Sequence, residues 1–543
     1  MLKSPTVHRR SPEFPAALRP CALGVDGMVS ASHSVISRAG AEVLESGGNA
    51  VDAVLAMAAV AWLALPGQCG IGGDAFALVY EPGGYIRAFC GSGFGPDGGT
   101  PEHYAGLSCV PRYGAASVAV PGAIAALAAL HAAGARRSLA ELWARAAALA
   151  RAGLPCTART RGDIAEHARR LSGDPDVAAA LLRDGAAPTV GARLPQPQLA
   201  STIDRLAADP GDLYTGELAE RAVSALCAAG APFSGDEWSA AGQVVPELAL
   251  RRRYRGRWVH QTPLPTPGWM VLDQLGMCEG ELDASEPLCA EAVDWLAGAA
   301  RIAFADRLAH AGSDSEGWRG RGAPEALAEA RELIRAGTLP GAVGAQAGGD
   351  TTSMIAVDRE GRAVSLVESL AFTFGAGTAI PKTGIVLNNR LGRGAYLMPG
   401  SPNEVRPRRR PLHTLNAWLV TDDEGRLCHV GGTPGGDGQV QWNTQVLSHL
   451  LDHGADPQSA VDAPRFAVFP GSDAEDLGSP PVLRCEDRLG AATLGDLATR
   501  GHTVAPVGDW GGGGSAQVAS VDHERGVICG GADSRQEGLS LGV

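Results

Sequence analysis

The chain has 543 residues, 45% of them hydrophobic and 19% charged, which is enough apolar material for a large core and for more than one domain. Its formal net charge of −13 argues against nucleic acid as a main partner, because phosphate binding requires clustered cations. The eleven cysteines are scattered singly without a CxxC pair, which argues against a disulfide framework and favours a reducing compartment. The 13 histidines lack metal-ligand spacing, so we expect no metal and no other cofactor.

The beginning of the chain predicts a protein that stays in the cytoplasm. Residues 1–27 contain basic residues and prolines but no apolar signal-peptide core, and we expect a disordered lead-in there. The longest apolar run, residues 50–67, is alanine-rich and contains Asp52, which is typical of a buried helix rather than a membrane span. We therefore expect no membrane partner.

The next part of the chain reads mainly as helix. From Met28 the pattern predicts strand, helix, helix and strand, with Asn49 capping the second helix at residues 49–65. Alanine- and leucine-rich helices follow within 120–230, and an amphipathic helix is predicted at 292–312. Residues 336–350 are small residues, proline and glycine, which predict a mobile linker.

Past Thr351 the pattern becomes rich in strands. Two hairpins are predicted, around the turns at 359–362 and 423–426, and a helix is predicted at 439–454. Because strands with flanking helices occur at both ends of the chain, we expect one α+β domain built from two distant segments.

The stretch "AGGDTTSMIAVD" suggests a chemical role for the first threonine of a strand. A threonine hydroxyl is a weak nucleophile, but the α-amine of an N-terminal threonine can act as its base, since such an amine has a pKa near 8. The glycines before Asp350 would let the chain strain while the hydroxyl of Thr351 attacks the preceding carbonyl. Alone, a Thr-Thr pair that opens a strand indicates only β-propensity.

Seven ordered blocks make this chain resemble the gamma-glutamyltranspeptidase family of N-terminal-nucleophile hydrolases over nearly its whole length. They are "ASHSVISRAGAEVLESGGNAVDAVLAMAAVAWLALPGQCGIGGDAFALVY", "GAASVAVPGAIAAL", "LYTGELAERAV", "ALRRRYRGRWVHQTPLPTPGW", "TTSMIAVDREGRAVSLVESL…FGAG…TGIVLNNR", "RPLHTLNAWLV" and "GGTPGGDGQVQ". The resemblance implies a four-layer αββα sandwich and self-cleavage between Asp350 and Thr351. Residues 28–350 would form the large subunit and 351–543 the small one, giving a heterodimer of the two fragments; a dimer of these stays open.

The resemblance also implies catalytic residues. Thr351 takes the position of the nucleophile, with Thr352 as the alternative one residue later. Ser369 stands where the family has a second threonine, whose hydroxyl contacts the nucleophile. Gly435 and Gly436 match the glycine pair whose N–H groups form the oxyanion hole.

The substrate-binding positions depart from the family pattern. The family holds an α-amino group with an asparagine and an acid, and an α-carboxylate with an arginine and two serines. The residues at or near these positions here are Ala371, Arg390, Arg393, Phe94, His413 and Thr414. Since two arginines repel an ammonium and attract a carboxylate, we expect a small anionic amide without the glutamyl α-amine as substrate. An oxamate- or glutaryl-like amide fits this expectation. Within the family, the sequence motifs most resemble those of the oxamate amidohydrolase branch.

Two alternatives stay open: a true gamma-glutamyl hydrolase or transferase that acts on glutathione-like substrates, and an unprocessed, inert relative that serves as a binding protein. A Ser-His-Asp hydrolase is a poor fit because no G-x-S-x-G elbow follows a strand. The glycines of "GQCGIGGDAF" have neither Rossmann nor P-loop spacing, which argues against a nucleotide site.

Overall fold

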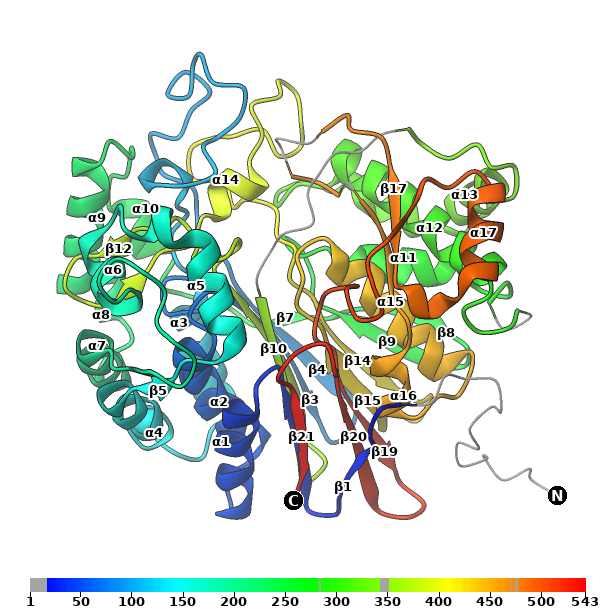
Figure 1. Cartoon of the computed structure of the whole chain (residues 1–543), viewed down its shortest axis with the longest axis horizontal. Helices are drawn as coiled ribbons and strands as arrows, with labels where there is room; N and C mark the ends of the chain where they lie inside the picture. Colours follow the sequence, from blue (N-terminus) through cyan, green and yellow to red (C-terminus); the bar gives the residue numbers. More distant parts are fainter. Residues whose placement is uncertain (1–16, 283–284, 342–350, 470, 474–476) are drawn as a thin grey trace.

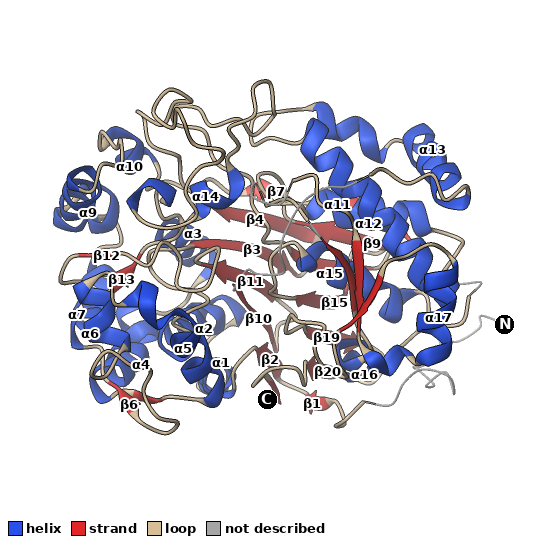
Figure 2. Cartoon of the chain, turned by 45° about the horizontal axis from the view of Figure 1, so that its top comes forward, coloured by secondary structure: helices blue, strands red, loops and turns tan. Residues whose placement is uncertain are grey.

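The structure is a computed structural model that describes residues 17–282, 285–341, 351–469, 471–473 and 477–543. Within these ranges, two seven-stranded sheets stack face to face, and helices cover both outer faces (Figures 1 and 2). The predicted four-layer αββα sandwich is confirmed. Asp350 and most of the predicted linker lie outside the described residues.

Both sheets combine strands from before and after residue 350. The first sheet has, in spatial order, β21 (Leu539–Gly542), β2 (Gly27–Ala31), β10 (Thr351–Asp358), β11 (Ala363–Ser369), β3 (Asp74–Glu81), β4 (Tyr85–Gly91) and β7 (Glu247–Leu248). The second has β1 (Ala22–Gly24), β20 (Val527–Ala532), β19 (Gln517–Asp522), β15 (Leu427–Gly432), β14 (Ala417–Thr421), β9 (Arg257–Gln261) and β8 (Leu250–Tyr254). The two segments of the chain therefore share one hydrogen-bonded framework.

The helices form two groups, one on each outer face. On the side of the first sheet lie α1 (Ser34–Glu45), α2 (Ala50–Ala64), α3 (Ala123–Gly134), α4 (Leu139–Ala152), α5 (Ala158–Leu171), α6 (Pro175–Leu181), α7 (Pro197–Ala208), α8 (Asp212–Thr215), α9 (Glu217–Ala228) and α10 (Asp236–Ala240). On the side of the second lie α11 (Gly268–Cys278), α12 (Ala290–His310), α13 (Pro324–Arg335), α15 (Gly438–Leu451), α16 (Pro457–Asp462) and α17 (Ala491–Thr499). Smaller elements are β5 (Leu154–Pro155), β6 (Arg193–Leu194), β12 (Ala379–Ile380), β13 (Ile385–Val386), β16 (Phe466–Phe469), β17 (Val482–Cys485), β18 (Val504–Pro506) and α14 (Arg390–Gly394).

Alternation along β10 decides which side chains face which layer. Ile355 and Val357 pack in a cluster with Leu419 and Val430 of the second sheet, so the odd-numbered residues face the interior between the sheets. Met354, with the other even-numbered residues, packs against the helical layer that contains α2. Thr351 therefore shares the inter-sheet face, and Thr352 shares the helix face.

The sequence places α2 accurately because its start carries a reciprocal cap. The Asn49 side chain accepts a hydrogen bond from the Asp52 N–H at 2.9 Å, and the Asp52 carboxylate accepts one from the Asn49 N–H at 3.0 Å. Such a capping box satisfies two donors that a helix start leaves unpaired. The cap predicted at Asn49 is confirmed.

The predicted disordered lead-in is wrong for its last residues. Ala22–Gly24 forms β1, which pairs antiparallel with β20, and the N–H groups of Val25 and Asp26 donate to the Val543 carbonyl at 2.9 and 2.7 Å. The open edge of the second sheet and the chain's last residue supply partners that local composition does not reveal. Residues 1–16 lie outside the described part.

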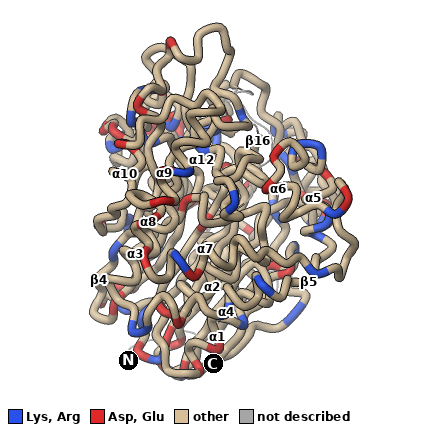
Figure 3. Tube along the Cα trace, turned by 90° about the vertical axis from the view of Figure 1, so that its left-hand side faces the viewer, with Lys and Arg blue, Asp and Glu red and all other residues tan. Residues whose placement is uncertain are grey.

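Figure 3 shows basic and acidic residues interspersed over the side of the molecule formed by the first group of helices. Of the helices that the structure describes, none combines the length and the apolarity needed to cross a bilayer.

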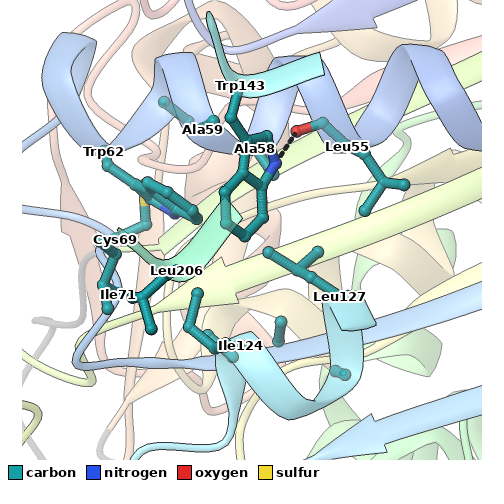
Figure 4. Packing of buried hydrophobic residues seen from close by; sticks show 14 of the residues in the cluster. Leu55, Ala58, Ala59, Trp62, Cys69, Ile71, Ile124, Leu127, Trp143 and Leu206 are labelled. Carbon is teal, nitrogen blue, oxygen red and sulfur yellow. Dashed lines mark hydrogen bonds between the residues drawn. The ribbon is translucent and has the colours of Figure 1, made fainter. Parts of the chain in front are cut away.

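The carboxyl group of Glu368, on β11, is buried between the first sheet and its helical layer. Glu368 lies opposite Thr352 in the strand pair and is 1% exposed, on the face that packs against the helices. Burial raises the pKa of Glu368 to about 8, and the nearby Trp62 indole acts in the opposite direction. Figure 4 shows Trp62 packed beside Trp143 and near Cys69, and the two indole rings meet edge to face at 5.3 Å. At neutral pH the folded protein therefore keeps Glu368 protonated.

We expect Glu368→Gln to remove a pH dependence of stability. Between pH 4.5 and 8 the unfolded chain loses the Glu368 proton while the folded chain keeps it. The free energy of unfolding of the wild type should therefore fall relative to the variant as pH rises, by at most about 1.4 kcal/mol per pH unit. Denaturant titrations across this range measure the difference, with the exposed Glu329→Gln as control. A difference that does not change with pH would contradict the buried, protonated state.

Candidate active site

The side chain of Thr351 lies at the beginning of β10 beside a second hydroxyl. It is 1% exposed, and its Oγ1 donates to the Ser369 Oγ at 3.3 Å. Ser369 ends β11 and stands directly opposite Thr351 in the strand pair. The Ser369 Oγ also accepts a hydrogen bond from the Ala371 N–H at 2.8 Å, which fixes its position. The two residues that the resemblance implied as nucleophile and supporting hydroxyl thus meet.

Thr352 is placed differently. Its side chain faces the helical layer opposite Glu368, and its Oγ1 has no hydrogen-bond partner among the described residues. The two threonines point to opposite faces because the side-chain period of a strand is two.

Gly435 and Gly436 form the turn between β15 and α15. Their φ angles are +123° and +57°, which favour glycine. A Cβ on Gly435 would lie 2.1 Å from the Trp442 ring, so no other residue fits without displacing that ring. Gly435 and Thr351 line the same cavity of about 260 Å³. A backbone N–H beside a hydroxyl nucleophile is the arrangement that an oxyanion hole requires.

A row of side chains extends from Thr351 across three strands. Ser369 pairs with Thr351 on one side and with Asp74, the first residue of β3, on the other. Residues paired in register share a face of the sheet, and neighbouring strands are about 4.8 Å apart. Asp74 is therefore two strands from Thr351 on the inter-sheet face, a position that sequence reasoning missed although "GGDAF" marks it.

Asp74 holds two of the residues predicted to bind substrate. Its Oδ2 lies 3.2 Å from the Arg390 Nε and 2.9 Å from the His413 Nε2, and all three residues are fully buried. Burial and the adjacent Arg390 lower the pKa of His413 to about 3, so its imidazole is neutral and donates to Asp74. Burial also lowers the pKa of Arg390 to about 10, which leaves it charged at neutral pH.

Several polar atoms around Asp74 remain unpaired. The Nη1 and Nη2 atoms of Arg390, the Nδ1 of His413 and the Oγ1 of Thr414 have no hydrogen-bond partner among the described residues. An unpaired buried donor costs about 1–3 kcal/mol, more when charged. The two Nη atoms carry four N–H donors, so this cluster is suited to an acceptor-rich group such as a carboxylate.

Arg393 is connected with the hydroxyl pair of Thr351 and Ser369 through Ala371. Its Nη1 donates to the Ala371 carbonyl at 3.1 Å, and its Nε forms an ion pair with Asp473 at 2.9 Å. Ala371 has a φ of +82°, which is uncommon for a residue with a side chain. Ser369 and Arg393 bind the N–H and the carbonyl of Ala371, respectively, which holds this conformation in place.

Charged groups of both signs lie around Arg390 and Arg393. The carboxylates that interact with them are Asp74, Asp473 and Asp437, and the guanidinium groups are Arg390, Arg393, Arg112 and Arg307. Burial raises the pKa of Asp473 to about 6 despite Arg393, so this carboxyl loses its charge in mild acid. Each of the three carboxylates is paired with one of these guanidinium groups: Asp74 with Arg390, Asp473 with Arg393 and Asp437 with Arg307.

Gln68 contacts Thr351 and Arg159 contacts Gln68, and sequence reasoning identified neither residue. With the Gln68 amide oriented to satisfy both neighbours, its NH2 donates to the Thr351 carbonyl at 2.8 Å. Its oxygen then accepts from the Arg159 Nη2 and Nε at 2.9 and 3.0 Å. Gln68 lies in the glycine-rich "PGQCGIGG", which marks a close backbone approach, whereas an arginine in the first turn of a helix gives no signal.

This chain is similar to known proteins over nearly its whole length. The gamma-glutamyltranspeptidase family profile matches residues 36–543. The glutathione hydrolase-like YwrD proenzyme of Bacillus subtilis is 32% identical over 534 residues, with 96% of this chain and 99% of the relative covered. The oxamate amidohydrolase proenzyme of Klebsiella pneumoniae is 31% identical over 528 residues, with 95% and 98% covered.

Among solved structures, cephalosporin acylase from Bacillus halodurans has a TM-score of 0.88 at 27% identity, with 100% of this chain and 99% of that chain covered. Similarity of sequence and of fold thus extends over the whole chain, and it includes the strands that carry Thr351, Ser369 and Asp74. This chain belongs to the gamma-glutamyltranspeptidase family and is an N-terminal-nucleophile amidohydrolase or transferase.

Proposed function

We propose that this protein cleaves its own chain before Thr351 and then hydrolyses small anionic amides through an acyl-enzyme on the Thr351 hydroxyl. The observation that carries the proposal is that Thr351, which donates a hydrogen bond to Ser369, lines one cavity together with Gly435 and directly follows the glycine-rich segment that ends at Asp350. Two relatives whose names include "proenzyme" support the processing step.

In the processing step, the Thr351 hydroxyl attacks the Asp350 carbonyl carbon and the peptide bond shifts to an ester. Water then hydrolyses the ester, which leaves the Asp350 carboxylate and the free α-amine of Thr351. The sheets keep the two fragments together, because each contains strands from both.

In the proposed catalytic cycle, the α-amine takes the proton of the Thr351 hydroxyl as the oxygen attacks the substrate carbonyl. The N–H groups of Gly435 and Gly436 stabilise the oxyanion, and Ser369 orients the attacking oxygen. The amine product leaves with the transferred proton, and water hydrolyses the acyl ester. Thr352 does not fit this role because its side chain faces the helical layer.

The acyl group is proposed to carry a carboxylate that binds at Arg390. The four unpaired Nη donors of Arg390, which is charged at neutral pH although it is fully buried, support this orientation. An α-ammonium group would be repelled by Arg393, which stands near the nucleophile through Ala371. The donors that fit are short dicarboxylic monoamides, of which oxamate and glutaryl amides are examples.

Thr351→Ala should abolish both processing and turnover. Denaturing electrophoresis and mass spectrometry are expected to find residues 1–350 and 351–543 as two pieces in the wild type and one intact chain in the variant. Thr351→Ser, which keeps a hydroxyl, should still process, and Thr352→Ala should process as the wild type does. An intact wild-type chain with full activity would refute the proposal, and an intact chain without activity would favour an inert binding protein.

A donor panel tests the acyl group. We expect the processed enzyme to hydrolyse oxamate or glutaryl amides with at least about a 10-fold higher kcat/KM than gamma-glutamyl-4-nitroanilide, since one charge-assisted contact is worth about 1.5–3 kcal/mol. Product release measured at equal substrate concentrations gives the ratio. Robust turnover of the gamma-glutamyl donor would instead support the glutathione hydrolase alternative.

Gly435→Ala should lower kcat by about 100-fold or more, the usual effect of losing one oxyanion donor. The added Cβ would collide with the Trp442 ring and shift the backbone N–H. Steady-state kinetics on processed protein measures the loss, and circular dichroism checks that the variant is folded. Gly341→Ala, whose Cβ would meet nothing within 4 Å, is the matched control.

A further inference from the structure

The cavity beside Thr351 has charged walls that the proposed catalytic cycle does not use. Arg159 and Arg484 line it together with the nucleophile, and none of the described residues that line it is acidic. Arg390 and Arg393, which serve the proposed acyl site, are not among those lining residues. The arginines that line this cavity are therefore different from those of the proposed acyl site.

Arg484 is the clearest anion-binding candidate in this cavity. It lies on β17, is half-buried, and its guanidinium stacks over the Phe469 ring at 5.1 Å. It forms no ion pair with a carboxylate of any residue that the structure describes. A guanidinium fixed against an aromatic ring keeps its edge donors available and loses little entropy on binding.

Arg159 adds a second cation and connects the cavity with the nucleophile. It lies in the first turn of α5, where it contacts Gln68 and, at 3.7 Å, Asp163. Because Gln68 also holds the Thr351 carbonyl, an anion at Arg159 would lie near the reacting atoms.

The remaining walls are suited to a small apolar body. Trp442, Phe469 and Val507 supply apolar surface. Gln536 donates to the Gly514 carbonyl at 3.1 Å, and its own side-chain oxygen has no partner among the described residues. That oxygen can accept a hydrogen bond from an N–H group.

We propose that this cavity binds the amine half of the substrate, and that it selects amines with a flat apolar body and a carboxylate, which Arg484 and Arg159 attract. The inference depends on the proposed function, because that function places the acyl half at Arg390, which does not line this cavity. Gln536 would accept the N–H of the leaving amine. The specificity of the enzyme then has two separate parts, one for each half of the amide.

The test compares two chromogenic donors that differ in one carboxylate, glutaryl-4-nitroanilide and glutaryl-3-carboxy-4-nitroanilide. We expect wild-type kcat/KM to be about 10-fold higher for the carboxylated donor, the lower end of the effect of a charge-assisted hydrogen bond. Arg484→Gln should reduce this ratio to about one by lowering kcat/KM for the carboxylated donor. Arg484→Lys should keep part of the preference, and the exposed Arg38→Gln on α1 should keep all of it.

A second measurement keeps the inference independent of turnover. Calorimetry on the folded protein should detect 5-amino-2-nitrobenzoate, the carboxylated product, with at least about 10-fold higher affinity than 4-nitroaniline, and Arg484→Gln should remove the difference. Product binding of this kind without any hydrolysis would support the cavity and refute the proposed function. Equal kcat/KM values for the two donors, together with equal affinities for the two products, in the wild type would overturn the inference while leaving the proposed function intact.

Discussion

The register of three adjacent strands is the constraint on which this site depends. Pairing of Thr351 with Ser369, and of Ser369 with Asp74, puts two hydroxyls and a carboxylate in one row between the sheets. A slip of one residue would turn Thr351 towards the helices and bring Thr352 into its place. The apolar residues farther along β10 oppose such a slip, because Ile355 and Val357 would leave the inter-sheet core.

The buried charged groups next to this row of side chains support the proposed preference for a carboxylate. Arg390 stays protonated at neutral pH although it is fully buried, and Asp74 meets only its Nε. A buried guanidinium with unpaired Nη donors stabilises an anion far more than water would, because it is already desolvated and fixed in position. The proposed preference for a carboxylate therefore follows from the desolvation of the Arg390 guanidinium, which takes place when the chain folds and not when the substrate binds.

Sequence alone predicted the layers, the cap at Asn49 and the segment that begins at Thr351, because each depends on local pattern or on ordered motifs. The sequence could not predict which residues pair with the buried charged groups. Asp74 is paired with Arg390 and His413 from segments more than 300 positions away, and Arg484 meets Thr351 only through a shared cavity. Long-range pairing of this kind also explains why β1 was mistaken for part of a disordered lead-in.

Trp442 couples the two halves of the proposed site. Its ring excludes any side chain from Gly435, and so fixes the backbone whose N–H would meet the oxyanion. The same ring forms a wall of the cavity proposed for the amine half. A ligand that moves the Trp442 ring would therefore change both the binding of the amine and the direction of the Gly435 N–H group. Selection of the amine and catalysis at the carbonyl would in that case vary together, although different arginines recognise the two ends of the substrate.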